Sequence, residues 1–356
     1  MSQMLHSVYE LYKSFIVDKL TKRIGISYII SHNHFVFKKK MEERGMEYNQ
    51  FLEHVRSEIS KIMPEAKVDI HHILKNNRVA LDGLTILEEG ETISPTIYLN
   101  EFYEKYCKGS NLEELLLEIW MVYQISRCKP VFDVSRLKEF DYIKDRIVFK
   151  LINYEENREM LEDMPYKRVL DLAMVFYFII EDEKLGVATA TISNSHLKLW
   201  GVSEEEVYQI AKMNTPHLLG WELKNMDSLI EEMVERNLSL HSVADEVIEE
   251  IRKATIGREH RSDSPMYVLT NTERFNGACC MLYQDVLSQF AKEQNSDLYI
   301  LPSSIHEVIL LPCSLSPNKE ELIDMVREIN RTEVSATERL SDQVYRYSLE
   351  DGILEM

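Results

Sequence analysis

Three stretches of the chain share one pattern, in which two apolar runs flank a short polar turn and an amphipathic helix follows. They are residues 68–86, 168–192 and 299–312. Apolar runs on both sides of a turn predict an antiparallel hairpin, and in the first stretch Asn76 and Asn77 tolerate the left-handed backbone that a tight turn requires. The three stretches share no residue-level identity, so they indicate a recurring architecture and not a sequence repeat. Antiparallel hairpins with helices in separate runs predict an α+β fold.

The length of the chain predicts two packed subdomains. With 356 residues, 45% of them hydrophobic, the chain can bury one large core or two smaller ones. Residues 1–45 are expected to form an N-terminal extension, because the apolar run Ile24–Phe37 is followed by the charged segment KKKMEERG. Residues 46–165 then form a helix-rich subdomain with one β-hairpin. Residues 166–356 form an α+β subdomain that carries a charged helical insert near 222–264.

A proline stop and a capping box predict where two helices lie in the sequence. One is expected from Tyr48 to about Ile62, because Pro64 stops it. Another is expected from Gly201 to Met213, because Ser203 and Glu206 have the spacing of a capping box at its start.

The charge and the cysteines narrow the class of protein. With 60 acidic and 41 basic residues, the formal net charge of −19 repels phosphate backbones and anionic lipids, so neither a nucleic-acid nor a membrane partner is expected. The first twenty residues carry charges that a secretory signal does not tolerate, which predicts a cytoplasmic protein. The five cysteines are an odd number without paired short spacings, so they are expected to be reduced thiols.

No cofactor or metal is expected. His32 and His34 share a face of a possible strand, and His71 and His72 are adjacent, but no nearby carboxylate or cysteine completes a coordination shell. The 11 glycines form no cluster of the kind that cradles a phosphate.

The stretch YILPSSIHEVILLP raises the possibility of a catalytic Ser/His/acid group at Ser304, His306 and Glu307. If Ile305 to Leu311 is a strand after a Pro-Ser-Ser turn, successive side chains point to opposite faces, which separates His306 from Glu307. Two residues apart on one strand, Ser304 and His306 are roughly 6–7 Å from each other, too far for a nucleophile and its base. The stretch is therefore interpreted as a covered strand of the core.

A second possible site joins His306 to the sequence NGACC. A cysteine at the start of a helix has its thiolate favoured by the helix dipole, and a histidine on a later strand could act as its base. A helix that begins near Asn276 would draw Cys279 into a buried apolar stripe and leave Cys280 at its flank. No orienting third residue can be named from spacing. No catalytic residue is therefore assigned, and Cys280 with His306 remains an alternative.

Five motifs in one order resemble a known family: ISPTIYLNEFYEKYCKG, KLINYEENREML, NTERFNGACCMLY, YILPSSIHEVILLP and LSDQVYRYS. As a set they are similar to the bacterial domain-of-unknown-function family numbered 5688, from roughly residue 46 to the end. The resemblance implies that residues 1–45 lie outside the shared domain, and it supplies no catalytic residue. It also implies that small residues suit the positions of Cys279 and Cys280, which argues against a thiol mechanism. We expect a non-enzymatic module that binds a protein or a small ligand, with a hydrolase using Cys280 and His306 as the alternative.

Overall fold

The computed structural model describes seven parts of the chain, and these divide into two compact units. Unit 1 comprises the described residues within 134–180 and 189–356, and unit 2 those from 46 to 126 together with 181–182 and 186–188. The boundary expected near residue 165 therefore falls inside unit 1. The described parts are residues 46–91, 94–126, 134–182, 186–229, 232, 266–315 and 318–356. The predicted N-terminal extension, residues 1–45, and nearly all of residues 230–265 lie outside them.

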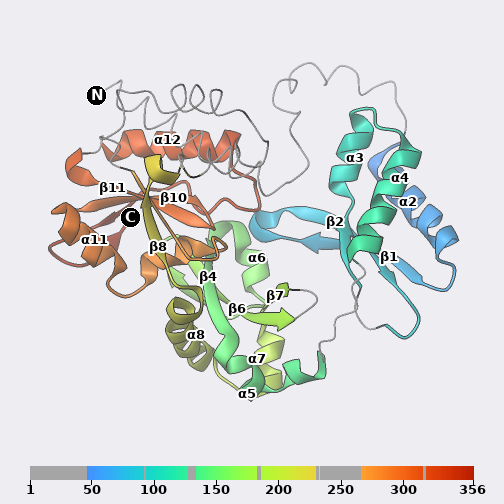
Figure 1. Cartoon of the computed structure of the whole chain (residues 1–356), viewed down its shortest axis with the longest axis horizontal. Helices are drawn as coiled ribbons and strands as arrows, with labels where there is room; N and C mark the ends of the chain where they lie inside the picture. Colours follow the sequence, from blue (N-terminus) through green and yellow to red (C-terminus); the bar gives the residue numbers. More distant parts are fainter. Residues whose placement is uncertain are drawn as a thin grey trace. The chain divides into compact units, whose positions relative to one another are not determined.

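Unit 2 is a three-stranded antiparallel sheet packed against three helices (Figure 1). The strand order is β1-β2-β3, so β1 and β3 are the two edges. The turn between β1 and β2 contains the expected left-handed asparagine, Asn77, with a φ of 59°. In chain order the elements are α2 (Tyr48–Ile62), β1 (Lys67–Leu74), η2 (Asn76–Arg78), β2 (Ala80–Leu87), β3 (Thr96–Tyr98), α3 (Asn100–Cys107) and α4 (Leu112–Ser126).

The core of unit 2 follows from helical and strand periodicity. Buried side chains on α2 and α4 recur every four residues, which puts them on one helical face. They meet the alternate side chains Leu84 and Ile86 of β2, which point to the same face of the sheet. The buried helical residues are Phe51, Val55 and Ile59 on α2 and Leu115, Ile119 and Tyr123 on α4.

Unit 1 contains two antiparallel sheets. The larger has six strands in the order β13-β12-β10-β11-β9-β8, and in the smaller β6 pairs with β4, β5 and β7. In chain order the helices and strands of unit 1 are η3 (Val134–Lys138), α5 (Phe140–Ile143), η4 (Lys144–Arg146), β4 (Ile147–Asn153), η5 (Glu155–Asn157), α6 (Arg158–Leu161), β5 (Tyr166–Val169), β6 (Leu172–Asp182), β7 (Gly186–Thr191), α7 (Asn194–Trp200), α8 (Glu204–Leu219), β8 (Glu222–Asn225), β9 (Tyr267–Thr270), η6 (Gly277–Leu282), α11 (Val286–Gln294), β10 (Leu298–Ser304), β11 (Glu307–Pro312), η7 (Cys313–Leu315), α12 (Lys319–Thr332), β12 (Tyr345–Tyr347) and β13 (Leu354–Glu355).

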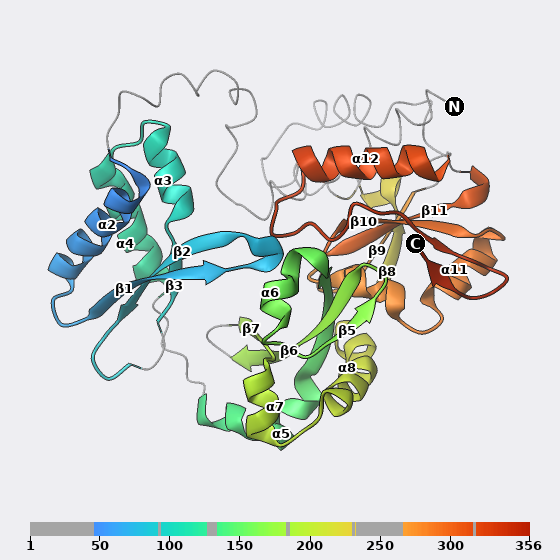
Figure 2. The same ribbon diagram turned by 180° about the vertical axis from the view of Figure 1, so that it is seen from behind.

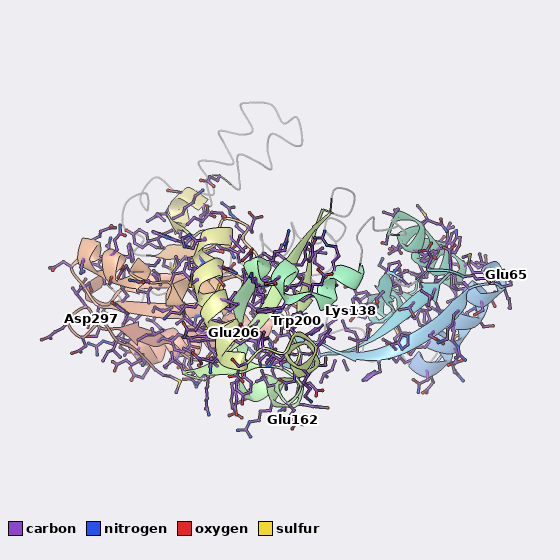
Figure 3. All side chains as sticks on the ribbon, turned by 90° about the horizontal axis from the view of Figure 1, so that it is seen from below. Glu65, Lys138, Glu162, Trp200, Glu206 and Asp297 are labelled. Atoms are coloured by element: carbon purple, nitrogen blue, oxygen red, sulfur yellow. The ribbon has the colours of Figure 1, made fainter. Side chains whose placement is uncertain are left out.

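The six-stranded sheet is covered on both faces. Helix α12 lies along one face (Figure 2). Its residues Leu322 and Val326 belong to one buried cluster with Leu301 and Ile309 of the hairpin. The opposite face joins η6, α11 and the smaller sheet in one continuous core. Between α7 and η3 the indole N–H of Trp200 donates to the carbonyl of Leu137 at 2.9 Å (Figure 3). The fold is α+β, with antiparallel hairpins followed by helices, as the sequence predicted.

The end of helix α8 and the segment 222–225 differ from the prediction. Helix α8 begins after Ser203, whose hydroxyl accepts the N–H of Glu206 at 3.1 Å, so the predicted cap is confirmed. The helix continues beyond Met213 to Leu219, because Thr215 and Leu219 extend its buried stripe. Residues 222–225, expected within a helical insert, instead form strand β8, which pairs with β9.

Candidate functional site

The turn of the hairpin in Tyr299–Pro312 is shifted from the expected position. The Pro-Ser-Ser sequence lies inside β10, and Ile305 and His306 form the two-residue turn, because Ser304 pairs directly with Glu307. The pairing register shifts between Leu301 and Ser304, and at such an irregularity the missing N–H of proline interrupts no ladder. The expectation of a strand beginning at Ile305 was therefore wrong.

The polar side chains of this hairpin bond to separate partners. The Ser304 hydroxyl donates to Glu307 Oε1 at 2.9 Å and accepts the backbone N–H of His306 at 3.1 Å. Nδ1 of His306 accepts the backbone N–H of Asn276 at 3.0 Å, which puts the proton of the neutral ring on Nε2, 3.4 Å from Glu338 Oε1. The seryl hydroxyl is thus engaged by the carboxylate of Glu307 rather than by the imidazole. These hydrogen bonds stabilise a turn that is buried, because the side chain of His306 is only 4% exposed.

The loop before η6 is held tightly against the same turn. A Cβ atom on Gly277 would lie 2.3 Å from Thr270 Oγ1 and 2.6 Å from the His306 carbonyl oxygen, so only glycine fits there. The next residue, Ala278, donates its N–H to the carbonyl of Ile305 at 3.2 Å. The NGACC sequence is therefore bonded to the hairpin through its backbone.

Cys279 and Cys280 both lie on η6, with their side chains in the core of unit 1. The expected single helix from Asn276 is interrupted, because η6 ends at Leu282 and α11 begins at Val286. Cys280 Sγ is 3.9 Å from the carbonyl oxygen of Gly220. Burial raises the pKa of the Cys280 thiol far above its ordinary value, with Cys279 adding to the effect. A nucleophilic cysteine requires the opposite shift.

The histidines considered as metal ligands are not brought together. His32 and His34 lie outside the described residues, and His71 and His72 point to opposite faces of β1. Within the described ranges no group of three or more His, Cys, Asp or Glu side chains could hold a metal ion.

The free edge of β1 in unit 2 is the feature that the sequence interpretation missed. On the other edge β1 pairs with β2 in unbroken register over all eight residues. Lys75 donates its N–H to the carbonyl of Val79 at 2.8 Å, and antiparallel bonding then alternates back along the strand. The inward bonds therefore belong to the odd-numbered residues. The N–H and C=O groups of Val68, Ile70, His72 and Leu74 face the free edge, and no strand pairs with it in the described part of the chain.

A groove of about 420 Å³ runs between this edge and α2. Ile70 and the half-buried Leu52 provide its apolar surface. Its charged groups are already paired within the protein: Arg56 contacts Glu53 at 2.5 Å, and Lys67 contacts Asp69 at 2.7 Å. The lining residues are Asn49, Leu52, Glu53 and Arg56 of α2 and Asp69, Ile70 and His71 of β1.

A chain of hydrogen bonds connects the start of α2 to β1 and β2 near the C-terminal end of β1. The hydroxyl of Tyr48, the first residue of α2, donates to Asp82 Oδ2 at 2.7 Å. His72 Nδ1 lies 3.0 Å from Asp82 Oδ1, and the N–H of Asp82 donates to Asn100 Oδ1 at 2.9 Å. Burial, together with Asp82, raises the pKa of Tyr48 well above its ordinary value, so the phenol stays a donor. One wall of the groove is thereby fixed relative to the other.

The fold and the groove define an α+β protein that presents one open, regular edge strand beside a helix. A family model described as "Family of unknown function (DUF5688)" matches residues 48–349, which is most of the chain. The chain therefore belongs to this family, and the resemblance of its motifs is confirmed. No curated protein and no solved structure matches the chain. No helix within the described ranges is long and apolar enough to cross a membrane.

Proposed function

We propose that this protein is a non-enzymatic binding module, which takes up an extended segment of a partner protein by strand addition to β1. The observation that carries the proposal is the edge of β1 beside the groove along α2, with which no strand pairs among the residues that the structure describes. Binding of this kind obtains affinity from main-chain hydrogen bonds and selectivity from pockets for alternate side chains.

The edge lacks several of the features by which proteins usually block strand addition. Natural edge strands are kept short or carry charged side chains, prolines, bulges or inward-pointing charges. Strand β1 does carry two charged residues, Lys67 and Asp69, and these are paired with each other at 2.7 Å. Strand β1 has eight residues, no proline and no bulge, and Val68 and Ile70 face the core side. Such an edge is a template for another strand.

The groove defines the chemistry of the segment that fits it. Because the charged groups along it are paired with one another, a charged ligand side chain would gain no unpaired counterion there. The exposed surfaces of Leu52 and Ile70 instead favour an apolar side chain on the bound strand. We therefore expect ligands with alternating apolar residues and no proline.

The proposal is tested by selection from a random dodecapeptide library displayed on phage, with the full chain as bait. Ile70→Pro removes an N–H that points away from β2, so it blocks the bound strand without breaking the β1–β2 ladder. Ile70→Ala is the matched control, because it removes the same side chain and keeps the N–H. Selected peptides should bind Ile70→Pro about tenfold or more weakly than Ile70→Ala, the effect of losing a well-made hydrogen bond.

A second variant covers the case in which Ile70→Pro does not fold. Leu52→Glu places a charge on the apolar surface of the groove from α2, and it leaves the strand unchanged. It should weaken the same peptides, whereas Glu65→Gln, in the exposed turn between α2 and β1, should not (Figure 3). Peptides that bind all of these variants equally would refute strand addition at β1.

A further inference from the structure

Strand β1 itself meets the requirements that its open edge sets for a bound segment. It has eight residues and no proline, and Val68 and Ile70 lie at alternate positions on its core side. No strand pairs with its outer edge within the described ranges. The outward N–H and C=O groups of one copy can therefore pair with those of a second copy of the chain.

Backbone hydrogen bonding restricts how two copies of β1 can pair. The outward groups belong to the even-numbered residues, and in an antiparallel ladder the hydrogen-bonded residues lie directly opposite each other. Two identical strands pair about a two-fold axis. The axis therefore passes through one residue of β1, so that even-numbered residues of one copy face even-numbered residues of the other.

An axis at Ile70 gives a close match between the two strands. Ile70 then faces the partner's Ile70, and residues 67–73 of both copies pair. Asp69 faces the partner's His71, and by symmetry the same contact forms a second time. These odd-numbered positions form the non-hydrogen-bonded pairs, in which side chains lie closest. The Asp69 carboxylate can accept an imidazole N–H in addition to its 2.7 Å contact with Lys67, because a carboxylate accepts several hydrogen bonds.

The other axes match the two strands less well. An axis at Asp69 would place two carboxylates opposite each other, and like charges there destabilise a strand pair. An axis at His71 would place Asp69 opposite the apolar Ile73. An axis nearer either end of β1 would shorten the paired stretch. The sequence of β1 thus favours the register with Ile70 on the axis.

The same register places an apolar side chain at the groove along α2. On the core side of the sheet the partner's Ile70 would lie next to Ile70, where the groove surface includes Leu52. It would take the position of the apolar side chain that the proposed function assigns to a bound strand. Pairing of two copies therefore satisfies both the main-chain and the side-chain requirements of the edge.

We propose that two copies of the chain pair β1 with β1 in antiparallel orientation about an axis at Ile70, and that a partner segment must displace the second copy. This inference rests on the proposed function of the edge. A single pair of strands buries far less area than a standard interface, so the dissociation constant should be on the order of tens of micromolar. Self-pairing would then regulate access to the groove, because the edge is open in dilute protein and occupied at high local concentration.

Sedimentation velocity of the full chain, from about 1 to 200 µM, measures the self-association. His71→Glu places a carboxylate opposite the partner's Asp69 at two symmetric positions, and it should weaken association about tenfold or more. Adding Asp69→Lys to His71→Glu restores opposite charges at both positions and should return association to within about threefold of the unchanged chain. His217→Glu, at an exposed residue of α8 in unit 1, adds the same charge and should have no effect.

Cross-linking tests the register independently of charge. The three cysteines other than the buried Cys279 and Cys280 are first replaced by serine. Ile70→Cys then lies opposite its own copy with the two Cα atoms about 5.5 Å apart, so air oxidation should produce a covalent dimer. His72→Cys instead faces the partner's Val68 and lies about 13 Å along the strands from its own copy, so it should stay monomeric.

Peptides from the library selection separate failure of this inference from failure of the proposed function. If both hold, a saturating peptide dissociates the dimer. A chain that is monomeric at about 200 µM, or a dimer that resists His71→Glu or the peptide, would overturn the inference. The proposed function would stand in that case if the peptides still discriminate Ile70→Pro from Ile70→Ala. Peptides that never discriminate the two Ile70 variants would overturn both, because displacement requires strand addition.

Discussion

The backbone N–H of Asn276 donates a hydrogen bond of 3.0 Å to Nδ1 of His306, and both residues are buried. This bond joins the loop before η6 to the β10–β11 turn, thirty residues further along the chain. Asn276 adopts a left-handed φ of 56°, which aims its N–H at the imidazole. His306 thus acts as an acceptor for a backbone group that would otherwise be orphaned in the core.

Replacing His306 with phenylalanine should destabilise the protein. The ring volume is kept and the contact with Phe275 can persist, but the N–H of Asn276 loses its acceptor. We expect a loss of about 1–3 kcal/mol in the free energy of unfolding, measured by urea denaturation. His71→Phe, at an exposed histidine, should change it by less than about 0.5 kcal/mol. Equal effects of both changes would deny the bond a structural role.

Gly277→Ala should be among the most damaging single substitutions. The added methyl group would lie 2.6 Å from both the Asn271 nitrogen and the His306 carbonyl oxygen, atoms that cannot move without breaking the turn. The cost should reach about 3 kcal/mol or more. Gly201→Ala is the control: its φ is +68° and nothing lies within 4 Å, so only backbone strain of about 1 kcal/mol is expected. A mild Gly277→Ala would indicate a looser loop.

Cys280 should react slowly with iodoacetamide in the native protein and rapidly after unfolding. Its side chain is fully buried, and burial raises the pKa of the thiol. The exposed Cys107 provides an internal control that should label readily under native conditions. Mass spectrometry of labelled peptides distinguishes the two. Fast labelling of Cys280 at mildly acidic pH, lost in a folded His306→Ala variant, would instead support the hydrolase alternative.

The stability of the protein should fall at alkaline pH, in part through Tyr345. Burial and the charge of Asp171 raise the pKa of Tyr345 well above its ordinary value of 10.0. A raised folded pKa contributes stability that is complete below the unfolded value and is lost as the pH rises beyond it. Tyr345→Phe loses the 2.7 Å bond to the charged Asp171, about 1.5–3 kcal/mol at pH 7, but should show a shallower decline between pH 9 and 11. Parallel declines in denaturation free energy would exclude this contribution.

Helices, caps and turns that depend only on residues close together in the chain could be predicted from the sequence. Helix α2 spans Tyr48–Ile62 as expected, because its periodic apolar face and Pro64 are both visible in sequence. The cap at Ser203 and the hairpin turn at Asn77 were predicted for the same reason. The turn at Ile305 and His306 was missed because neither residue is a turn former. It is set by distant partners, since Glu338 O accepts the N–H of Ile305 and Ala278 donates to its carbonyl.

The candidate site could not be predicted because strand order is not a local property. The sequence KVDIHHIL predicts a strand, but nothing in it says which edge remains open once β2 and β3 pair. The contact of His72 with Asp82 follows from that pairing, in which the two residues are direct cross-strand partners. The groove further requires α2 to lie beside β1, which the core of unit 2 determines.

Hydrogen exchange at single-residue resolution tests strand addition to β1 most directly. The amides along β1 are compared in the full chain with and without a saturating peptide from the library selection. The amides of Val68, Ile70, His72 and Leu74 face the free edge, so they alone should slow, by about tenfold or more, while the inward amides between them stay protected throughout. Protection that spreads evenly over both sets, or that appears only on α2, would contradict binding by strand addition.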